Sequence, residues 1–314
     1  MSKLNPESEK WFVIVNPVAA RGKAGKAWPK IEARLKGLLP EWQHAFTQGL
    51  GHGIQLADEA IQSGYRHLLA VGGDGTNNEV VNGIMGQKLV ASDQITYAFL
   101  PIGTGNDWIK SHGIPKGLDQ WILMFQQGNT TTQDIGLVYY YYEGQEKKRY
   151  FANVAGLAYD AFVVRYAANH RGWMLNHIFY LMMIMRCLFM YRLCRARVLF
   201  DHQMREDRYY TINVGICKYS GGGMSLVPHA VSDDGLLALT LAGPITKLSV
   251  LLNTYRFYND SIGDHPQVET FQVKELEILP SGITPTLLEV DGEFLGETPV
   301  RFEIIPSALR IVVP

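Results

Sequence analysis

The stretch Gly72-Gly73-Asp74-Gly75-Thr76-Asn77-Asn78-Glu79-Val80-Val81-Asn82-Gly83 decides the fold of the first part of this chain. It follows the apolar run 67–71, which is typical of a buried strand, and leads into a segment that predicts a helix over 76–85. Thr76 and Glu79 have the spacing of a capping box at the start of that helix. A strand, a glycine turn and a helix start suit an anion, because glycine lets the backbone approach phosphate oxygens and the first helical N–H groups point at them.

A carboxylate inside such a turn indicates a metal ion as well as a nucleotide. Asp74 would repel phosphate unless a cation lay between them, so the turn predicts Mg²⁺ bound together with the nucleotide. Thr76 and Glu79 fit a purely capping role equally well. For Gly73 and Asp74, phosphate binding explains the pattern better than a tight turn alone.

This stretch resembles the nucleotide-binding signature of the diacylglycerol kinase catalytic-domain family, which also includes sphingosine and ceramide kinases. GGDG alone is shared with NAD kinases and phosphofructokinases, whereas the extension NNEVVNG resembles the lipid-kinase branch. Further stretches fit the same family and extend the resemblance over roughly residues 10 to 313. They are Val15-Asn16-Pro17, Pro101-Ile102-Gly103-Thr104-Gly105-Asn106-Asp107, Asn153-Val154-Ala155-Gly156, Gly221-Gly222-Gly223-Met224, Asp233-Asp234-Gly235 and Val290-Asp291-Gly292-Glu293.

The composition is that of a globular protein. A chain of 314 residues is long enough for two domains, and a content of 47% hydrophobic and 19% charged residues excludes a disordered chain. The formal net charge of −1 argues against a nucleic-acid partner. The three cysteines form no CxxC pair, which argues against a disulfide framework or a zinc site and favours a reducing compartment. The first ten residues carry no signal-peptide core, and Arg186 interrupts the longest apolar stretch, so we expect a cytoplasmic protein without a transmembrane span.

The first third of the chain alternates strands and helices, which predicts an α/β domain with a parallel sheet and helices on both faces. We predict strands over 11–15, 43–47, 67–71 and 95–100, and helices over 27–39, 54–63 and 76–85. From about residue 130 the sequence is strand-rich, with one helical region over 163–191. The resemblance implies a C-terminal β-sandwich domain. We therefore expect an ATP-binding domain over 1–130 and a lipid-acceptor domain over 131–299, with residues 300–314 returning to the first domain.

The candidate nucleotide loops directly follow the predicted strands, at the edge where parallel sheets bind ligands. Basic residues at Arg21, Lys23 and Lys26 add positive charge near the first loop, although an ordinary solvated loop explains them equally well. The resemblance implies that Asp107 joins a water and metal network near the phosphates, although a carboxylate at a helix start explains it equally well. The resemblance implies nucleotide contacts for Asn16, Pro17, Thr47, Gly72, Gly73, Asp74, Gly75, Thr76, Asn77, Asn78, Glu79, Thr104 and Asp107, and a catalytic role for Asp74.

Two acidic turns in the second part gain a function from the resemblance. The segment Val231-Ser232-Asp233-Asp234-Gly235-Leu236 is similar to a structural Mg²⁺ loop, in which Asp234 and the main-chain carbonyls of Val231 and Leu236 hold the ion. As a pattern alone it is a common turn. Asp291-Gly292-Glu293 is similar to the motif that supplies the general base for the acceptor hydroxyl. The sequence does not choose between Asp291 and Glu293.

Residues 161–200 contain six arginines and no lysine, aspartate or glutamate. Within them, the apolar and Met-rich segment 178–191 is typical of a helix that lies on an anionic membrane surface or opens onto a lipid pocket. A core helix that covers the β-sandwich, with solvated arginines at its ends, also fits. The six are Arg165, Arg171, Arg186, Arg192, Arg195 and Arg197.

Together these patterns predict an ATP- and Mg²⁺-dependent lipid kinase, peripheral on the inner face of the membrane, that acts on diacylglycerol or a related lipid. One alternative is an NAD kinase-type enzyme, which the NNEVVNG extension and the basic helix disfavour. The other is a nucleotide- or lipid-binding regulator without turnover, which the intact Asp291–Glu293 motif disfavours. The identity of the lipid and the oligomeric state, including a homodimer, stay open.

Overall fold

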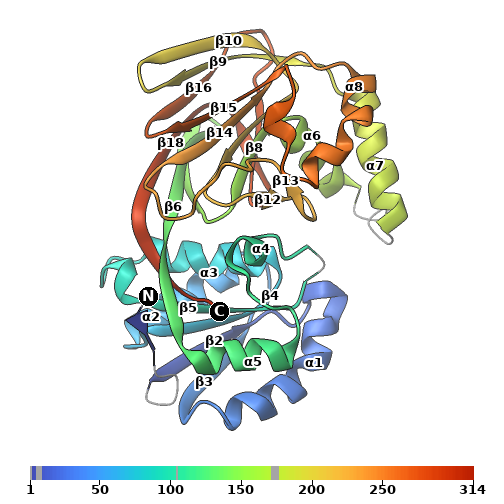
Figure 1. Ribbon diagram of the computed structural model, residues 1–314. Helices are drawn as coiled ribbons and strands as arrows, with labels where there is room; N and C mark the ends of the chain where they lie inside the picture. The colour runs from blue at the N-terminus through green and yellow to red at the C-terminus, as the bar shows by residue number, and fades with distance from the viewer. Residues whose placement is uncertain (1, 5–8, 104, 171–176) are drawn as a thin grey trace. The chain divides into compact units, whose positions relative to one another are not determined.

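The structure, a computed structural model, describes residues 2–4, 9–103, 105–170 and 177–314. The chain divides into two compact units, Met1–Ile135 with Ile305–Pro314, and Gly136–Ile304 (Figure 1). It passes from one unit to the other along β6 (Asn129–Tyr142) and returns along β18 (Glu293–Val312). The sequence places the boundaries after residues 130 and 299, slightly before those of the structure.

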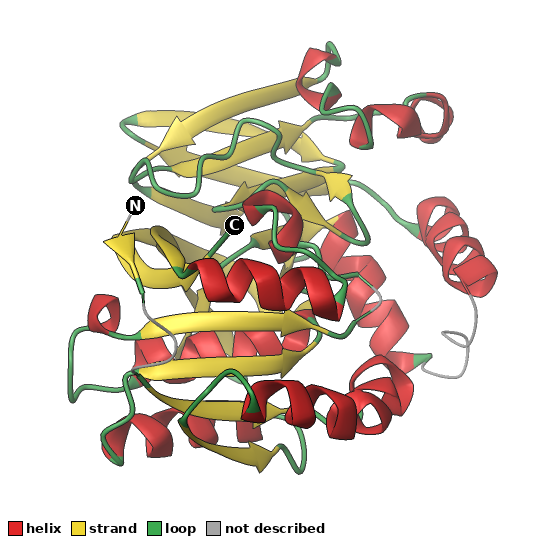
Figure 2. Cartoon of the chain, turned by 60° about the horizontal axis from the view of Figure 1, so that its bottom comes forward, coloured by secondary structure: helices red, strands yellow, loops and turns green. Residues whose placement is uncertain are grey.

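The first unit is a parallel sheet with helices on both faces (Figure 2). The strand order is β3 (Glu41–Phe46), β2 (Lys10–Val15), β4 (His67–Gly72), β5 (Thr96–Pro101) and the end of β18. β18 joins in parallel, with Arg310 opposite Thr96 and Ile311 opposite Tyr97. All six residues of β5 are buried, as expected for a strand that is covered on both faces.

The helices of this unit include two that the sequence patterns did not predict. Trp121 and Phe125 on α5 are buried, and the indole N–H of Trp121 donates to the carbonyl of Phe99 at 2.8 Å, which docks this helix on the sheet. α4 is only five residues long and carries too little periodicity to be recognised. The helices are α1 (Ala19–Lys36), α2 (His52–Gln62), α3 (Asp74–Gly86), α4 (Trp108–His112) and α5 (Leu118–Gln127).

The second unit is built from antiparallel strands around one apolar core, which confirms the predicted β-rich domain. One run of neighbouring strands is β15–β14–β11–β8–β17–β18, and a second joins β10, β9 and β16 to β18. Core side chains come from both runs, among them Leu157, Val198, Leu239, Leu288 and Phe302. The other strands of this unit are β7 (Gln145–Phe151), β8 (Val154–Ala158), β9 (Cys194–Phe200), β10 (Gln203–Tyr209), β11 (Thr211–Gly215), β12 (Tyr219–Ser220), β13 (Met224–Ser225), β14 (Leu237–Ala242), β15 (Val268–Val273), β16 (Leu276–Pro280) and β17 (Leu287–Val290).

Three helices of the second unit lie along one side of its strands (Figure 1). The single helical region predicted over 163–191 is two helices, α6 (Tyr159–Asn169) and α7 (His177–Met190), and α8 (Lys247–Leu252) was not predicted. An apolar cluster includes Val163 of α6, Cys187 and Leu188 of α7, and Ile245 just before α8, and Val250 and Leu251 of α8 pack against it. Within the described ranges, no helix is both long and apolar enough to cross a membrane.

Candidate functional site

Asp74 joins the two predicted glycine loops of the first unit into one structure. It begins α3, and its carboxylate accepts the N–H of Asn106 at 2.7 Å and the N–H of Asp107 at 2.9 Å. Gly73 and Gly103 touch across the loops, since a Cβ on Gly103 would lie 3.0 Å from the Cα of Gly73. The glycines are therefore needed for the close approach of two backbones at the ends of β4 and β5.

Negative charge is concentrated where these loops meet. Burial and the nearby Asp107 carboxylate raise the pKa of Asp74, while the N–H groups of the second loop oppose that rise. Lys110 forms an ion pair with Asp107 at 2.7 Å. A Cβ on Gly105 would lie 3.1 Å from an oxygen of Asp74 and 3.7 Å from an oxygen of Asp107, so both carboxylates border the same glycine. A cation suits this place because it would relieve the repulsion between them. The predicted nucleotide contact Thr104 lies outside the described residues.

Other predicted nucleotide residues gather at the same edge of the sheet. The amide of Asn16, which follows β2, donates to the hydroxyl of Thr76 at 2.9 Å. Thr47 follows β3, is buried, and donates its N–H to the carbonyl of Val15 at 2.8 Å. Pro17 holds the next loop, because its carbonyl accepts the N–H of Gly25 at 3.0 Å. The carboxyl ends of β2, β3 and β4 thus contribute to one polar edge.

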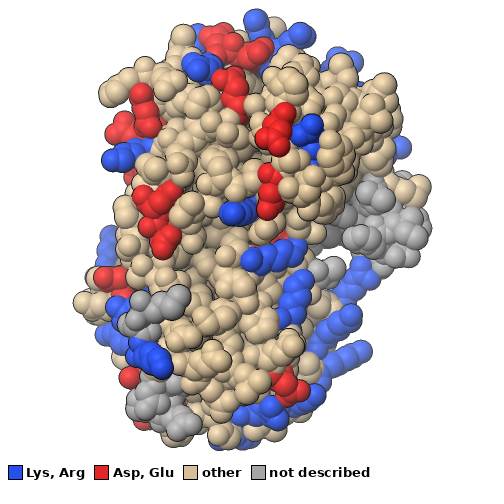
Figure 3. All heavy atoms as spheres, viewed as in Figure 1, with Lys and Arg blue, Asp and Glu red and all other residues tan. Residues whose placement is uncertain are grey.

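The start of α1 is a strained loop. Ala20, Arg21 and Gly22 have φ values of 49°, 60° and 82°, a left-handed conformation that is costly for the two residues with a Cβ. Such strain is typical of ligand-binding segments and points to a function for this loop. Arg21, Lys23 and Lys26 are exposed here, and Figure 3 shows basic side chains gathered on the side of the first unit where Figure 1 labels α1.

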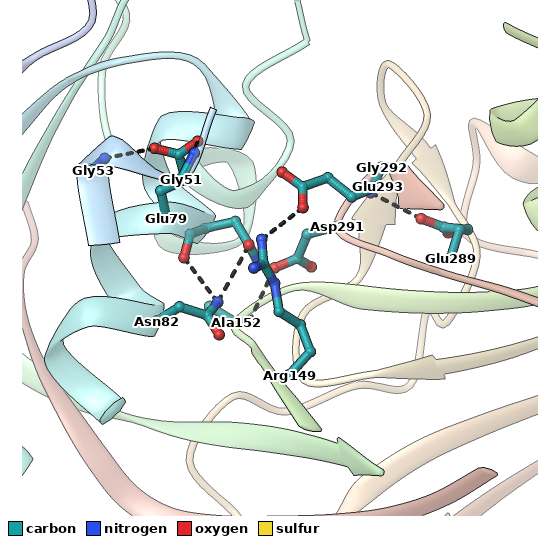
Figure 4. A network of polar contacts seen from close by, with 11 residues as sticks. Gly51, Gly53, Glu79, Asn82, Arg149, Ala152, Glu289, Asp291, Gly292 and Glu293 are labelled. Carbon is teal, nitrogen blue, oxygen red and sulfur yellow. Dashed lines mark hydrogen bonds and ion pairs between the residues drawn. The ribbon is translucent and has the colours of Figure 1, made fainter. Parts of the chain in front are cut away.

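The capping box predicted at Thr76 and Glu79 is wrong. α3 starts two residues earlier, at Asp74, so Thr76 lies inside its first turn. The Glu79 carboxylate instead accepts the N–H groups of Gly51 and Gly53, each at 2.8 Å (Figure 4). Glu79 therefore caps the start of α2, a contact between distant segments that spacing within one helix cannot reveal.

Asn77 and Asn78 are buried in the first unit. Asn77 accepts the hydroxyl of Tyr97 at 2.8 Å, and the carbonyl of Asn78 accepts the side-chain amide of Asn82 at 2.9 Å. The contact of Asn77 joins α3 to β5, whereas that of Asn78 lies within α3. Their predicted nucleotide contacts, and that of the exposed Gly75, stay predictions.

In the second unit, Asp291 and Gly292 form the two-residue turn between β17 and β18. Their φ values of 49° and 85° fit a type I′ hairpin turn. The carboxylate of Asp291 accepts the N–H of Val154 at 3.1 Å and the N–H of Ala152 at 3.3 Å. Asp291 is therefore fixed by the backbone at the start of β8.

Glu293 is held differently. Its carboxylate forms an ion pair with the guanidinium of Arg149 at 2.6 Å, and Figure 4 shows the two side chains pointing toward one another. Arg149 lies on β7, more than a hundred residues away in sequence, and no motif marks it. Arg149 and the buried Glu289 are the two residues of this region that the sequence patterns missed.

The predicted metal loop is an exposed turn in the structure. One oxygen of Asp234 accepts the N–H of Leu236 at 3.0 Å, and the other accepts the amide of Gln272 at 2.9 Å. The first contact is the side-chain turn that Asp favours. Of the residues that the structure describes, no three acidic, histidine or cysteine side chains group as metal ligands. A cation here would depend on the main-chain carbonyls of Val231 and Leu236 beside Asp234.

Comparison with known proteins identifies the family. The model of the diacylglycerol kinase catalytic domain matches residues 10–138, and that of the YegS C-terminal NAD kinase beta sandwich-like domain matches residues 153–313. This chain belongs to the diacylglycerol kinase-like family of lipid kinases. It is accordingly a phosphotransferase with the two-domain organisation that the sequence predicts.

The relatives of this lipid kinase span nearly its whole length. A Staphylococcus epidermidis protein named diacylglycerol kinase is 26% identical over 305 residues, covering 96% of this chain and 91% of its own. A crystal structure described as a diacylglycerol kinase from Bacillus anthracis shares the fold, with a TM-score of 0.71, 20% identity and coverage of 98% and 97%. Yeast NADH kinase complexed with NADH has a related fold, with a TM-score of 0.53, 13% identity and coverage of 99% and 84%.

Proposed function

We propose that this lipid kinase transfers the γ-phosphoryl group of Mg²⁺-bound ATP to a hydroxyl group of diacylglycerol or a related lipid. The observation that carries the proposal is the pair of glycine loops that Asp74 ties together at the carboxyl ends of β4 and β5. Phosphoryl transfer depends mainly on positioning and on neutralising charge, and these loops offer both. The names of the relatives support a lipid acceptor.

The nucleotide side of the reaction belongs to the first unit. N–H groups at the start of α3 face the phosphates, and the exposed basic residues at the start of α1 add positive charge. Asp74 and Asp107 would hold the Mg²⁺, directly or through water, because both border Gly105 and repel each other without a cation. When bound, the ion neutralises charge that develops on the phosphoryl oxygens.

The acceptor side belongs to the second unit, which contains a narrow and largely apolar pocket with a volume of about 20 Å³. Its walls include Ala242, Ile245 and Phe257, and its volume is that of about one water molecule, so an acyl chain would enter only if these apolar walls moved apart. One end is polar, and the buried hydroxyl of Thr240 at that end has no hydrogen-bond partner among the described residues. A polar group of the lipid would satisfy that hydroxyl.

A transfer assay tests the function. The protein is incubated with labelled ATP and Mg²⁺, together with diacylglycerol in mixed micelles, a total lipid extract, or NAD. We expect label in a lipid product and none in NADP. Label in NADP alone would favour the NAD kinase-type alternative, and ATP binding without any labelled product would favour the regulator. Either result would overturn the proposal.

A membrane-facing role for α7 and α8 is part of the proposal. α7 buries Cys187 and Leu188 in the apolar cluster of the second unit and exposes Met182, Phe189 and Met190. One part of the α7 surface therefore packs in the core, as the core interpretation predicts, and the exposed apolar part is available to a membrane in the proposed role. α8 and the turn after it expose further apolar side chains, at Leu248, Leu252, Tyr255 and Tyr258. Apolar side chains exposed on neighbouring helices suit insertion into a bilayer surface.

The arginines contribute less charge than the sequence suggests. β10 is antiparallel to β9 and places Glu206 opposite Arg197, with an ion pair at 2.9 Å. Arg186 donates to the hydroxyl of Tyr166 at 3.0 Å, and Arg165 lies over the ring of Phe294. Glu206 on β10 thus neutralises part of the positive charge of residues 161–200, which contain no acidic residue of their own. Arg192 and Arg195 remain exposed.

Vesicle sedimentation checks the membrane role. We expect binding to vesicles with anionic lipid that falls as salt is added, since each exposed cation contributes about 1 kcal/mol near the surface. Arg192→Gln with Arg195→Gln should remove most of the salt-sensitive part. Phe189→Ser with Leu252→Ser should remove the salt-resistant part. Leu89→Ser with Leu123→Ser, exposed in the first unit, is the control. Equal binding by all variants, or to neutral and anionic vesicles alike, would contradict the role.

The Mg²⁺ loop has its own test. If Asp234 holds a structural Mg²⁺, added Mg²⁺ should raise the melting temperature of the wild-type protein without nucleotide but not that of Asp234→Ala, because binding to the folded state alone stabilises it. Asp233→Ala, the neighbouring exposed residue, is the control and should respond like the wild type. An unchanged response in Asp234→Ala would reduce the segment to a turn.

A further inference from the structure

Glu289 lies directly below the Asp291-Gly292-Glu293 turn. It is 2% exposed, and its carboxylate accepts the N–H of Gly292 at 2.8 Å (Figure 4). The pairing of β17 with β18 shifts register between Leu288 and Glu289. Irregularities of this kind re-aim side chains and occur next to active sites. Glu289 thus contacts the turn through the peptide that links its two acidic residues.

A second carboxylate shares this buried place. Glu289 is paired across the sheet with Gly156 of β8, and a Cβ on Gly156 would lie 2.5 Å from a Glu289 oxygen and 2.9 Å from the Cβ of Asp160. Only glycine leaves room for both acidic side chains. Asp160, on the first turn of α6, accepts the hydroxyl of Thr211 at 2.6 Å and the amide of Asn213 at 2.5 Å.

The backbone is strained where it brings Asp160 to this place. Ala158, the residue before α6, has φ of 70° and ψ of −113°, a conformation that residues with a Cβ rarely adopt. Strain of this kind persists only where the surrounding structure enforces it, and it is frequent at functional sites. Burial raises the pKa of Glu289 well above its usual range, and the charges of Asp160 and Asp291 raise it further. Burial likewise raises the pKa of Asp160.

We propose that Glu289, which is buried beside Asp160, is the positioning residue of the Asp291-Gly292-Glu293 turn. Its carboxyl group accepts the N–H of Gly292, which sets the place of Asp291 and Glu293, and in its protonated form it would donate toward Asp160. This assignment rests on the proposed function for its effect on turnover. Its effect on stability does not depend on that function.

Measurements of kcat on Glu289 variants distinguish a positioning role of this residue from a role in packing alone. Glu289→Gln has the same shape, can accept the Gly292 N–H and can donate to Asp160, so we expect kcat close to that of the wild type. Glu289→Leu removes both contacts and should lower kcat by about 10²-fold through displacement of the turn. KM for ATP should stay unchanged in both, because the nucleotide loops belong to the first unit. Glu277→Leu, exposed on β16, is the control.

Gly156→Ala gives an independent test if Glu289→Leu fails to fold. The added methyl group would displace Glu289 and Asp160 while leaving both groups in the chain, so kcat should fall with an unchanged KM for ATP. A Glu289→Gln protein as inactive as Glu289→Leu would overturn the positioning role. So would a Glu289→Leu protein with wild-type kcat.

Melting temperature against pH tests the protonated state without any substrate. A raised pKa in the folded state means that the wild-type protein loses stability as pH rises above about 4.5 and through the folded pKa. Glu289→Gln lacks the titratable carboxyl group. Its melting temperature should therefore rise relative to that of the wild type as the pH increases from 5 to 9. Parallel curves for the two proteins would overturn the proposal. If the wild type phosphorylates no lipid, the proposed function fails while this measurement still stands.

Discussion

The Asp291→Asn variant is expected to lose about 10²–10⁴-fold in kcat for lipid phosphorylation, because it removes the carboxylate that we propose takes the proton from the acceptor hydroxyl. The structure favours Asp291 over Glu293 for this role. Protonation of Glu293 would break a charge–charge pair with Arg149, whereas protonation of Asp291 would weaken only its hydrogen bonds from the uncharged N–H groups of Ala152 and Val154. Asparagine keeps the size of the side chain but can accept only one of the two N–H groups of Ala152 and Val154, so the hairpin should survive with a lower melting temperature.

Glu293→Gln and Arg149→Met separate the two acidic residues. Both should raise KM for the lipid or lower kcat by a smaller factor, because they loosen the turn without removing the base. Stability serves as the control, since an unchanged melting temperature excludes unfolding as the cause. If Glu293→Gln is less active than Asp291→Asn, then Glu293 is the general base and Asp291 is the residue that positions the turn. Full activity in both Asp291→Asn and Glu293→Gln would show that neither acidic residue of the turn takes part in catalysis.

Asp74→Ala is the second variant with a large expected effect. It should lower kcat by about 10²–10³-fold, because it removes a carboxylate from the proposed metal and phosphate site and frees the second glycine loop. The N–H groups of Asn106 and Asp107 would lose their acceptor, which costs up to about 1–3 kcal/mol of unfolding free energy for each group. A typical stability is about 5–15 kcal/mol, so the protein should remain folded but with a lower melting temperature.

Isothermal titration with a Mg²⁺–nucleotide analogue, thermal melting and turnover should be measured on the same preparation. Asp93→Ala, an exposed residue of the same unit, is the control and should match the wild type in all three. A folded Asp74→Ala protein with near-normal turnover would remove Asp74 from the site. If turnover is lost while the affinities for nucleotide and Mg²⁺ are unchanged, Asp74 stabilises the transition state and does not contribute to binding.

Much of the first unit follows from the sequence because its signals are local. Buried strands such as β4 and β5 are continuous apolar runs, and glycine turns punctuate them, so strand, loop and helix recur with a short period. α4 and α5 were not predicted, because the sequence signals that would mark them are weak or depend on a contact with another segment. α4 is too short to show periodicity, and α5 is fixed by the contact of Trp121 with Phe99 on a neighbouring strand.

The second unit was harder to predict because its pairings are distant. β18 runs over twenty residues, from the acidic turn to the sheet of the first unit, yet its sequence shows only alternating polarity. β10 was missed as well, and with it the Glu206 side chain that neutralises Arg197. A charge count over a window of the chain therefore overstated the positive charge of the β9 surface.

The sequence by itself determined the strand, glycine-loop and helix order of the first unit and predicted which loops carry the chemistry, since glycines and acidic residues at strand ends have a meaning that does not depend on distant partners. Only the tertiary structure decided what each side chain does there. Glu79 caps another helix, Asp74 ties two loops, and Glu289 lies under the catalytic turn. Each of these contacts joins segments that come together only on folding, and a carboxylate satisfies whichever N–H group the fold brings to it.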